Sequence, residues 1–289
     1  MAQTTTTNLG DKLKEISIVD TIIDGRKFKP DGFINKFNIL KVDGPVKVLA
    51  EAEAVVAGIY GEMETISTSN DNVVNEFQLN PNKRVARTIE VSEQFLNDSA
   101  IGYENYVADL IAGSIGRTIE KQITLDGYTG AVDPKKLQRL HVTDVQTAVG
   151  TSATSLSINE VKAKYISMIK NKTARDCFWL FNIDSMLSVT DSLGNEYMKF
   201  EDVPEGADAT LLGLPVYFAT LGDTTDAKIT RAIIVNPTAY TIAMKDLTIE
   251  VIEGDTIQSL RRSKVIKGEI YVDAVVTNSY GRLLIAQAS

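Results

Sequence analysis

The fold is decided by the stretch RVARTIEVSEQFLNDSAIGYENYVADLIAGSIGRTIEKQITLDG, residues 84–127. Side chains alternate with period two along residues 84–91, which predicts a β-strand with one protected face. A short helical turn opens at Ser92. Apolar residues then recur every three or four positions from Gly102 to about Asp126, which predicts a long amphipathic helix. Its apolar stripe consists of Tyr103, Tyr106, Val107, Leu110, Ile111, Ile115, Ile119 and Ile123.

Three glycines lie in or after this helix. Gly113 and Gly116 would each cost about 1 kcal/mol in a helix interior, so we expect another backbone to pack closely against them. Gly127 is expected to end the helix as a C-terminal glycine.

The sequence before residue 84 predicts an arm and a hairpin. Two long strands, from Val46 to about Gly58 and from Val73 to Val91, are separated by the polar stretch GEMETISTSNDN. They predict a hairpin over residues 46–91, which needs a partner surface because an isolated hairpin is marginally stable in water. Residues 1–45 predict an extended arm with a short helix, and such an arm must lie on another domain or subunit.

The sequence after the long helix predicts a mixed α/β unit. Ser157 and Glu160 form a capping box, so a helix should begin there. Its buried face is expected to comprise Ile158, Val161, Tyr165, Met168 and Ile169. Further elements are expected as a strand at CFWLFN, a helix at 183–189, and strands at 214–219, 229–235 and 239–243. The last strands are expected at 248–253, 266–277 and 283–286, where they would return to pack against the long helix.

The residue composition excludes several kinds of site. The 289 residues carry 30 basic and 38 acidic side chains, a net charge of −8, which disfavours direct nucleic-acid binding. No stretch approaches 18 consecutive apolar residues, so we expect no membrane span. A single histidine, His141, and a single cysteine, Cys177, exclude zinc sites built on several such ligands and an intramolecular disulfide. Cys177 is expected in a core strand and His141 at a surface or interface.

Phosphate-binding and dinucleotide-binding glycine motifs are absent from the sequence, as is a Gly-x-Ser-x-Gly elbow. Paired carboxylates such as Glu51 with Glu53 are frequent enough to arise by chance on solvated faces. We therefore expect no catalytic residues, no metal and no cofactor.

Five stretches, in this order, resemble the major capsid proteins of tailed bacteriophages, whose fold is shared with encapsulin nanocompartments. Each alone is a weak signal, but together they cover about residues 46–289. They are RVARTIEVSEQFLNDSA, with Ser92, Leu96, Asp98 and Ser99 in a Ser-x-x-x-Leu-x-Asp-Ser turn; LDG at residues 125–127; SINEVKAKYISMIK followed by CFWLFN; DSLGNEYM at 191–198; and TLLGLPV at 210–216.

The resemblance implies an α+β phage major-capsid fold in four parts. An N-terminal arm would span residues 1–45, and the extended β-hairpin, or E-loop, residues 46–91. A peripheral (P) domain with a long spine helix and a returning β-sheet would comprise residues 92–150 and 246–289. An axial (A) domain of α/β type would be inserted between them at residues 151–245.

The resemblance also implies a structural, non-enzymatic role. The chain would be a major capsid protein that self-assembles as hexamers and pentamers into an icosahedral shell. That shell would enclose double-stranded DNA without sequence-specific binding and without a membrane. Portal protein, and scaffolding or decoration proteins, are the further partners implied. Assembly would take place in the host bacterial cytoplasm, and the protein would reside in the virion capsid.

Some features depart from the family pattern. Certain members crosslink their shells through a lysine in the hairpin, but residues 48–82 contain no lysine, so we predict no such isopeptide bond. Many members carry a scaffolding segment of about a hundred residues before the arm, whereas only about 45 residues precede this hairpin. A scaffold is therefore expected to be separate, already removed or absent.

Charged residues and one asparagine, in the hairpin, at its base and in two loops, are expected at subunit interfaces. These are Glu62, Glu64, Asn70, Asp71, Lys83, Arg84, Arg87, Asp223, Asp226, Arg261 and Arg262. Basic residues cluster at 83–87 and at 261–267, and they would form salt bridges across subunits or contact DNA. Two alternative functions stay open, an encapsulin-type shell around cargo enzymes and a soluble α/β enzyme that uses a carboxylate pair.

Overall fold

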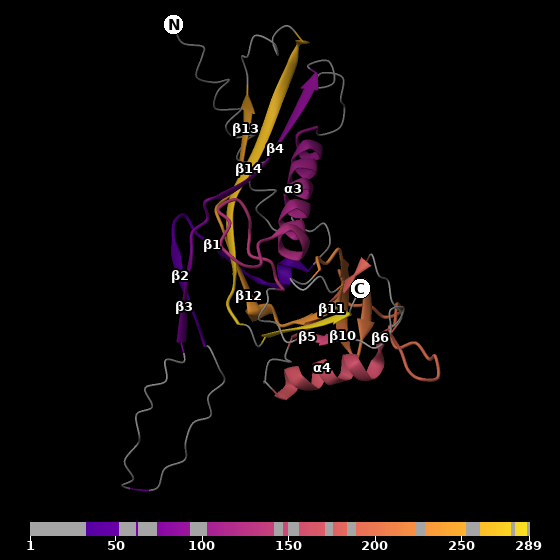
Figure 1. Cartoon of the computed structure of the whole chain (residues 1–289). Helices are drawn as coiled ribbons and strands as arrows, with labels where there is room; N and C mark the ends of the chain where they lie inside the picture. The colour runs from indigo at the N-terminus through magenta and orange to yellow at the C-terminus, as the bar shows by residue number, and fades with distance from the viewer. Residues whose placement is uncertain are drawn as a thin grey trace, which may run out of the picture.

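The computed structural model describes residues 33–51, 62, 74–92, 103–141, 147–149, 156–170, 176–183, 189–223, 229–252, 261–278 and 281–287. Helices and strands are mixed, as expected for an α+β chain, and the strands form two main sheets (Figure 1).

The first sheet is organised around one long strand. This strand, β14 (Ser263–Val276), pairs antiparallel along one edge with β4 (Lys83–Ser92). Its other edge pairs with β13 (Thr248–Ile252) and then with β12 (Tyr240–Met244). A short strand near the N-terminus, β1 (Asn38–Lys41), adds parallel to β12. Side chains of β4 alternate between half-buried and exposed, so the predicted period of two is confirmed.

The long helix, α3 (Tyr103–Lys121), packs along this sheet and continues into a π-helical turn, Gln122–Asp126 (Figure 1). Its predicted stripe is half-buried at Leu110 and buried at Val107, Ile111, Ile115, Ile119 and Ile123, while the side chains of Tyr103 and Tyr106 lie outside the described residues. Amphipathic spacing therefore predicted both the helix and the face that it buries.

The expected close approach at Gly113 is wrong. A Cβ at Gly113 would meet only the Arg117 side chain, at 3.5 Å, whereas a Cβ at Gly268 of β14 would lie 2.3 Å from Ile111 Cγ2. The glycine that allows α3 and the sheet to approach is therefore on the strand, and it faces a fully buried isoleucine.

Gly127 ends the helix, as predicted, but without the left-handed backbone that is usual at this position. Its φ of −63° and ψ of 161° are extended rather than left-handed. A Cβ there would lie 2.3 Å from the Gln122 carbonyl oxygen and 2.7 Å from that of Leu137. The glycine is needed because the 137–139 backbone crosses the helix end, where the Tyr128 amide donates to Leu137 and the Arg139 amide donates to Tyr128.

Substitution Gly268→Ala is expected to lower the free energy of unfolding by about 1–3 kcal/mol, because the added methyl would force Ile111 from its packed position. Chemical denaturation of the purified chain measures this. Gly44→Ala is the matched control, since a Cβ at Gly44 meets nothing within 4 Å. Equal stability of the two variants would contradict the close approach.

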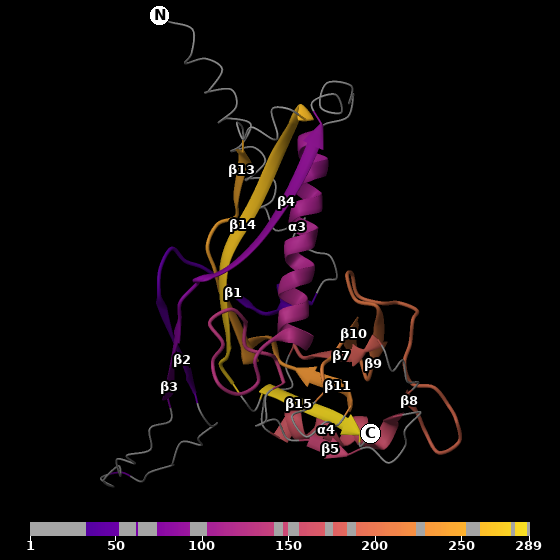
Figure 2. The same cartoon turned by 45° about the horizontal axis from the view of Figure 1, so that its top comes forward.

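The second sheet has six strands, with α4 (Ile158–Lys170) beside it (Figure 2). Alternate residues of its buried strands face two different cores. The strands in spatial order are β5 (Thr147–Val149), β15 (Arg282–Gln287), β11 (Ile229–Val235), β7 (Phe178–Asn182), β10 (Leu214–Ala219) and β9 (Ala209–Leu211).

Two hydrophobic cores hold the sheets and helices together. In β7, Phe178 and Leu180 join the core that includes the α3 stripe and the first sheet, here called the central core. Trp179 and Phe181 point the other way, into the core that includes α4, here called the α4 core. One sheet thus separates the two cores, and its strands are hydrophobic on both faces, as in sheets covered on both sides.

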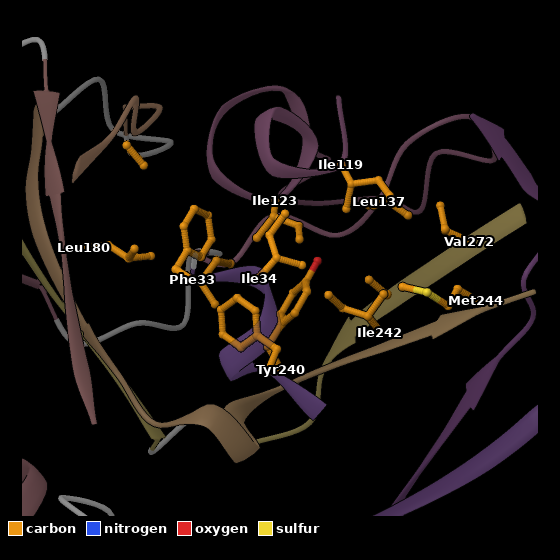
Figure 3. Close-up of a cluster of buried hydrophobic side chains, with 14 of the residues drawn as sticks. Phe33, Ile34, Ile119, Ile123, Leu137, Leu180, Tyr240, Ile242, Met244 and Val272 are labelled. Carbon is orange, nitrogen blue, oxygen red and sulfur yellow. The ribbon is translucent and has the colours of Figure 1, made fainter. Parts of the chain in front are cut away.

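The segment predicted as an arm contributes to the central core (Figure 3). Phe33 and Ile34, at the start of the short 3-10 helix Ile34–Lys36, are buried. The ring of Phe37 lies 5.6 Å from that of Phe178 in the second sheet and 5.2 Å from that of Tyr240 in the first. Of the two places expected for this arm, residues 33–41 therefore take the one on other parts of the same chain, where aromatic side chains anchor the segment between the two sheets.

The predicted hairpin ends at Leu79 rather than at Val91, and its first strand beyond Glu51 lies outside the described residues. Strands β2 (Val46–Glu51) and β3 (Val74–Leu79) pair with each other, from Val46 opposite Leu79 to Glu51 opposite Val74. The return strand predicted from Val73 to Val91 is broken at Asn80–Asn82, and its second half is β4 in the first sheet. Pro81 removes a ladder donor at this point, which explains the break.

Two strands lie in a different sheet from the one that the predicted domain boundaries imply. Strand β12, expected in the inserted unit at 151–245, lies in the first sheet, and β15, expected in the returning sheet at 246–289, lies in the second. Strand β5, from the 92–150 segment, also joins the second sheet. Periodicity identified these strands, but it carries no information about which neighbour each one pairs with.

Local predictions around α4 are largely confirmed. The Ser157 amide donates to Glu160 Oε2 at 3.2 Å, and Ser157 Oγ accepts from the Asn159 amide, so the capping box forms. Ile158, Val161 and Met168 are buried and Tyr165 packs against the α4 core. Ile169 is 51% exposed, so its expected place on the buried face is wrong. Most of the helix expected at 183–189 lies outside the described residues.

The stretch TLLGLPV forms a tight hairpin between β9 and β10. Leu211 pairs with Leu214, and the two residues between them, Leu212 and Gly213, have φ values of 53° and 79°. Positive φ at both central positions is the geometry of a type I′ turn, which matches the twist of antiparallel strands. Another short pair, β6 (Leu156–Ser157) and β8 (Val189–Thr190), lies beside α4's first turn.

Candidate functional site

The eleven residues expected at interfaces do not form one cluster. Glu64, Asn70, Asp71 and Asp226 lie outside the described residues. Glu62 is exposed. The remaining six lie at the hairpin base, along β4, near the start of β14 and in the loop after β10.

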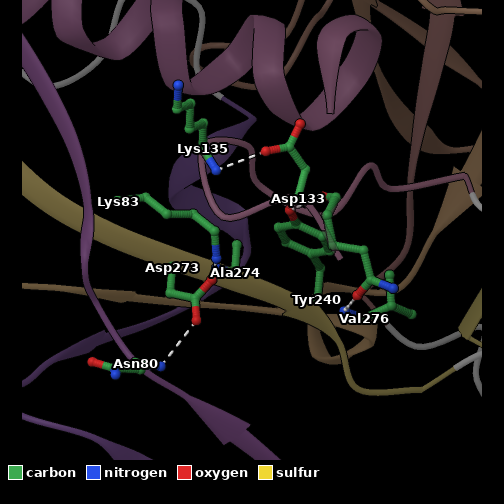
Figure 4. A network of polar contacts seen from close by, with 9 residues as sticks. Asn80, Lys83, Asp133, Lys135, Tyr240, Asp273, Ala274 and Val276 are labelled. Atoms are coloured by element: carbon green, nitrogen blue, oxygen red, sulfur yellow. Dashed lines mark hydrogen bonds and ion pairs between the residues drawn. The ribbon is translucent and has the colours of Figure 1, made fainter. Parts of the chain in front are cut away.

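Lys83 lies in a polar network at the hairpin base (Figure 4). Its Nζ contacts Asp273 Oδ1, and the two side chains are only 10% and 13% exposed. Asp273 Oδ2 accepts from the Asn80 amide at 2.9 Å, and Oδ1 accepts from the Ala274 amide at 2.9 Å. A single carboxylate of β14 thus fixes both the last residues of the hairpin and the first residue of β4.

Three more basic residues of the two clusters, Arg84, Arg261 and Lys267, pair within the chain. Arg84 Nη1 lies 3.7 Å from Glu269 Oε2, and Arg261 Nη1 lies 3.9 Å from Glu90 Oε2. Lys267 Nζ lies 3.1 Å from a carboxylate oxygen on each of Glu250 and Glu269.

Arg87 and Arg262 make no such ion pair among the described contacts. The Arg87 guanidinium donates to the Leu110 carbonyl of α3 at 3.2 Å, which ties β4 to the helix. Arg262 is exposed at the turn before β14, with a φ of 48°. In the two clusters, Lys83, Arg84, Arg261 and Lys267 are therefore paired with acids of the same chain, which reduces the positive charge available for DNA or for a neighbour.

Asp223 is exposed, and its backbone takes part in a contact with residues 139–141. Its carbonyl oxygen accepts from Arg139 Nη2 at 2.5 Å, and the adjacent Gly222 carbonyl accepts from His141 Nε2 at 2.5 Å. His141 is 2% exposed, so its expected place at a surface is wrong. Burial, together with the nearby charges of Arg139 and Arg282, lowers the pKa of His141 to about 3, against the smaller opposing effect of the Gly222 hydrogen bond. The imidazole is therefore neutral at physiological pH.

Cys177 is buried before β7, as predicted. Burial raises the pKa of its thiol to about 12, although a hydrogen bond from Asn236 opposes the shift. A thiol that stays protonated is neither a nucleophile nor a metal ligand, so this residue acts as a small hydrophobic side chain.

The comparisons with known proteins agree with this architecture. A model of the phage capsid family matches residues 21–281. The chain belongs to the phage capsid family. No curated protein matches the chain.

Solved structures extend the likeness to the fold. The capsid of an empty GTA particle is 16% identical, with a TM-score of 0.64 and coverage of 90% of this chain and 91% of that one. A structure titled Gordonia phage Cozz is 16% identical, with a TM-score of 0.57, and the match covers 90% of this chain and 87% of that one. One titled Mycobacterium phage Adephagia is 15% identical, with a TM-score of 0.59, and the match covers 90% of this chain and 91% of that one. The expected α+β capsid fold is confirmed.

In a member of the phage capsid family, exposed apolar side chains are candidates for contacts between subunits, and the sequence analysis missed them. Leu49 of β2 is 67% exposed, Leu193 85% and Phe200 61%, and Ile166 and Ile169 of α4 about half. Large apolar residues on an outer face depart from the amphipathic pattern of a solvated helix, and this was the signal available in the sequence.

No helix of the described segments is long and apolar enough to cross a membrane.

Proposed function

We propose that this chain is the major capsid protein of a tailed double-stranded DNA bacteriophage. It would assemble as hexamers and pentamers into the icosahedral head that encloses the genome. The observation that carries the proposal is the hairpin of β2 and β3, which forms a sheet of its own and extends away from the body of the molecule (Figure 1).

Among the described residues, no third strand pairs with this hairpin. A ribbon of two strands is marginally stable in water unless a third strand or a packed face supports it. Leu49 and the Lys47–Glu76 pair are exposed, so the described face buries little apolar surface. A neighbouring subunit in a shell would supply the missing surface and would link hairpin stability to assembly.

The charge distribution suits a container rather than a nucleic-acid binder. The net charge is −8, and basic residues of β4 and β14 pair with acids of the same chain. A shell with a net acidic charge would enclose DNA without binding a specific sequence, and would not hinder packaging or ejection. The phage capsid family consists of structural proteins, and this membership supports a role without catalysis. The buried Cys177 thiol stays protonated and the buried His141 ring stays neutral, which supports the same role.

The remaining partners follow from this role. A portal protein would occupy one vertex, and separate scaffolding or decoration proteins would assist assembly. The shell would assemble in the host bacterial cytoplasm and the protein would reside in the virion.

Electron microscopy of the purified chain, with light scattering, tests the proposal. Polyhedral shells or free rings of five and six subunits are the expected result, and shells from an infected host should contain DNA. Shells that contain enzymes and no DNA would indicate an encapsulin-type function instead. A monomer or small discrete oligomer under every condition would overturn the capsid proposal.

Mature particles are expected to run as a single band of monomer size on a denaturing gel. The reason is the absence of lysine between residues 48 and 82, which leaves the hairpin beyond Lys47 without an amine for an isopeptide bond. A ladder of covalent multimers that survives denaturant and reducing agent would contradict this prediction.

A further inference from the structure

The outer face of α4 is apolar and basic. Its exposed positions recur every three or four residues, so they form one stripe along the helix. Ile166 is 50% exposed and Ile169 51%, values typical of a surface position although both side chains are large and apolar. The exposed residues of the stripe are Asn159, Lys162, Ala163, Ile166, Ile169 and Lys170.

The segment between β8 and β9 is apolar and acidic. Residues 191–208 contain six acidic side chains and one basic side chain, a local charge of −5. Two large apolar residues project among them, since Leu193 is 85% exposed and Phe200 61%. The exposed acids nearest to Phe200 in the sequence are Glu201 and Asp202. We call residues 191–208 the acidic loop.

The acidic loop is held in shape by its own hydrogen bonds. Asp191 Oδ1 accepts from the Leu193 amide at 2.8 Å and from the Asn195 amide at 2.9 Å, which forms the turn that places Leu193 outward. The Asn195 side chain, which donates to Asp191 Oδ2 at 2.8 Å, together with these backbone bonds lowers the pKa of the Asp191 carboxyl, so it stays charged. Backbone bonds between Lys199 and Thr210, at 2.9 and 2.8 Å, close the far end. A surface that is already ordered loses little entropy when a partner binds.

The two surfaces are complementary but do not cover each other within one chain. Lys162 Nζ lies 5.4 Å from the ring centre of Tyr197, so the loop meets α4 only near the beginning of the helix. Lys170 is eight residues further along, about 12 Å at 1.5 Å per residue. Figures 1 and 2 show that the segment between β8 and β9 projects outward beyond the N-terminal end of α4. Both Ile166 and Phe200 therefore stay exposed.

We propose that the outer face of α4 in one subunit binds the acidic loop of the next subunit, with Ile166 and Ile169 packed against Phe200 and the α4 lysines opposite Glu201 and Asp202. The partner is thus a second copy of this chain. A contact between two different surfaces is heterologous, and repeated by rotation it closes a ring. This inference rests on the proposed capsid function, and it names the surfaces that would join neighbours within one ring.

Site-directed crosslinking tests the pairing. The chain offers a clean background because its only cysteine, Cys177, is buried and its thiol stays protonated. Variants I169C and F200C are assembled separately and as a mixture, then treated with a short bis-maleimide. Crosslinked dimers are expected only from the mixture, and a double variant I169C/F200C should give a ladder of multimers. Ladder length would then report the number of subunits in the ring.

The controls separate this inference from the proposed function. Rings or shells that form while the mixture gives no dimers would overturn the pairing and leave the capsid function intact. Dimers from I169C alone would also overturn it, because they indicate a contact between two identical surfaces. A wild-type chain that never assembles would overturn both proposals.

A charge exchange gives a second measurement. Variant K170E is expected to raise the protein concentration required for half-maximal assembly about tenfold, because like charges would then face each other. Adding E201K in the same chain should restore assembly, since the exchanged charges meet between subunits. Variant K135E is the matched control, because Lys135 is equally exposed but lies on neither surface. Equal losses in K170E and K135E, or no rescue by E201K, would overturn the pairing.

Discussion

Replacement of Asp273 by alanine is expected to lower the free energy of unfolding by about 3–5 kcal/mol, the cost typical of breaking a buried ion pair from one side. The variant leaves the Lys83 ammonium, which is 10% exposed, without its carboxylate. It also removes the acceptor for the Asn80 and Ala274 amides. Chemical denaturation measures the stability, and hydrogen exchange at the Asn80 amide reports whether the hairpin base opens.

The control for this prediction is another Lys–carboxylate pair of the same chain. Lys47 and Glu76 lie in the hairpin, and their side chains are 65% and 51% exposed. Glu76→Gln should change the free energy of unfolding by less than about 1 kcal/mol, because an exposed pair is well solvated. An equal loss of unfolding free energy in Asp273→Ala and Glu76→Gln would contradict this prediction. It would show that burial does not make the Lys83–Asp273 pair more stabilising than an exposed pair.

Acid is expected to destabilise the folded chain through His141. Its pKa is lowered to about 3 in the fold, first by burial and then by Arg139 and Arg282, whereas an unfolded histidine titrates near 6.5. Between these values the unfolded chain binds a proton that the folded chain does not, so stability falls as pH falls from 6.5 toward 3. The slope is about 1.4 kcal/mol per pH unit for one group. Denaturation curves of the unassembled chain at pH 7, 6 and 5 measure it.

His141→Gln provides the control. A glutamine amide can still donate to the Gly222 carbonyl, but it does not titrate. Because the chain has a single histidine, this variant removes all histidine titration at once. Its stability should be nearly independent of pH between 7 and 5, where carboxylates change little. An equal slope in the wild-type chain and His141→Gln would contradict the role assigned to His141.

Elements with a strong periodic pattern could be predicted from the sequence. The stripe of α3 and the strands at 214–219 and 229–235 were expected within a residue or two of their observed bounds. Periodicity identifies an element and the face that it buries, but not its neighbour in a sheet. For this reason β4 was assigned to the hairpin, and β12 and β15 were each assigned to the wrong sheet.

The candidate site could be predicted only in part. Lys83 and Arg84 stand out as charges beside a turn, but their partners Asp273 and Glu269 lie about 190 residues away in the sequence. A lone His141 in a polar stretch carries no periodic signal of burial. Phe33, Ile34 and Phe37 follow a polar segment, and their burial depends on two sheets that form from residues much later in the chain.

The arrangement of strands has a consequence for synthesis of the protein. Strand β14 is bonded to β4, β12 and β13, and β15 lies between β5 and β11 in the interior of the other sheet. A nascent chain therefore cannot close either sheet until residues 263–287 have left the ribosome. Contacts so distant in sequence make folding slow. Chains that stop early would expose unpaired strands and be removed by proteases, so only completed subunits would reach the growing shell.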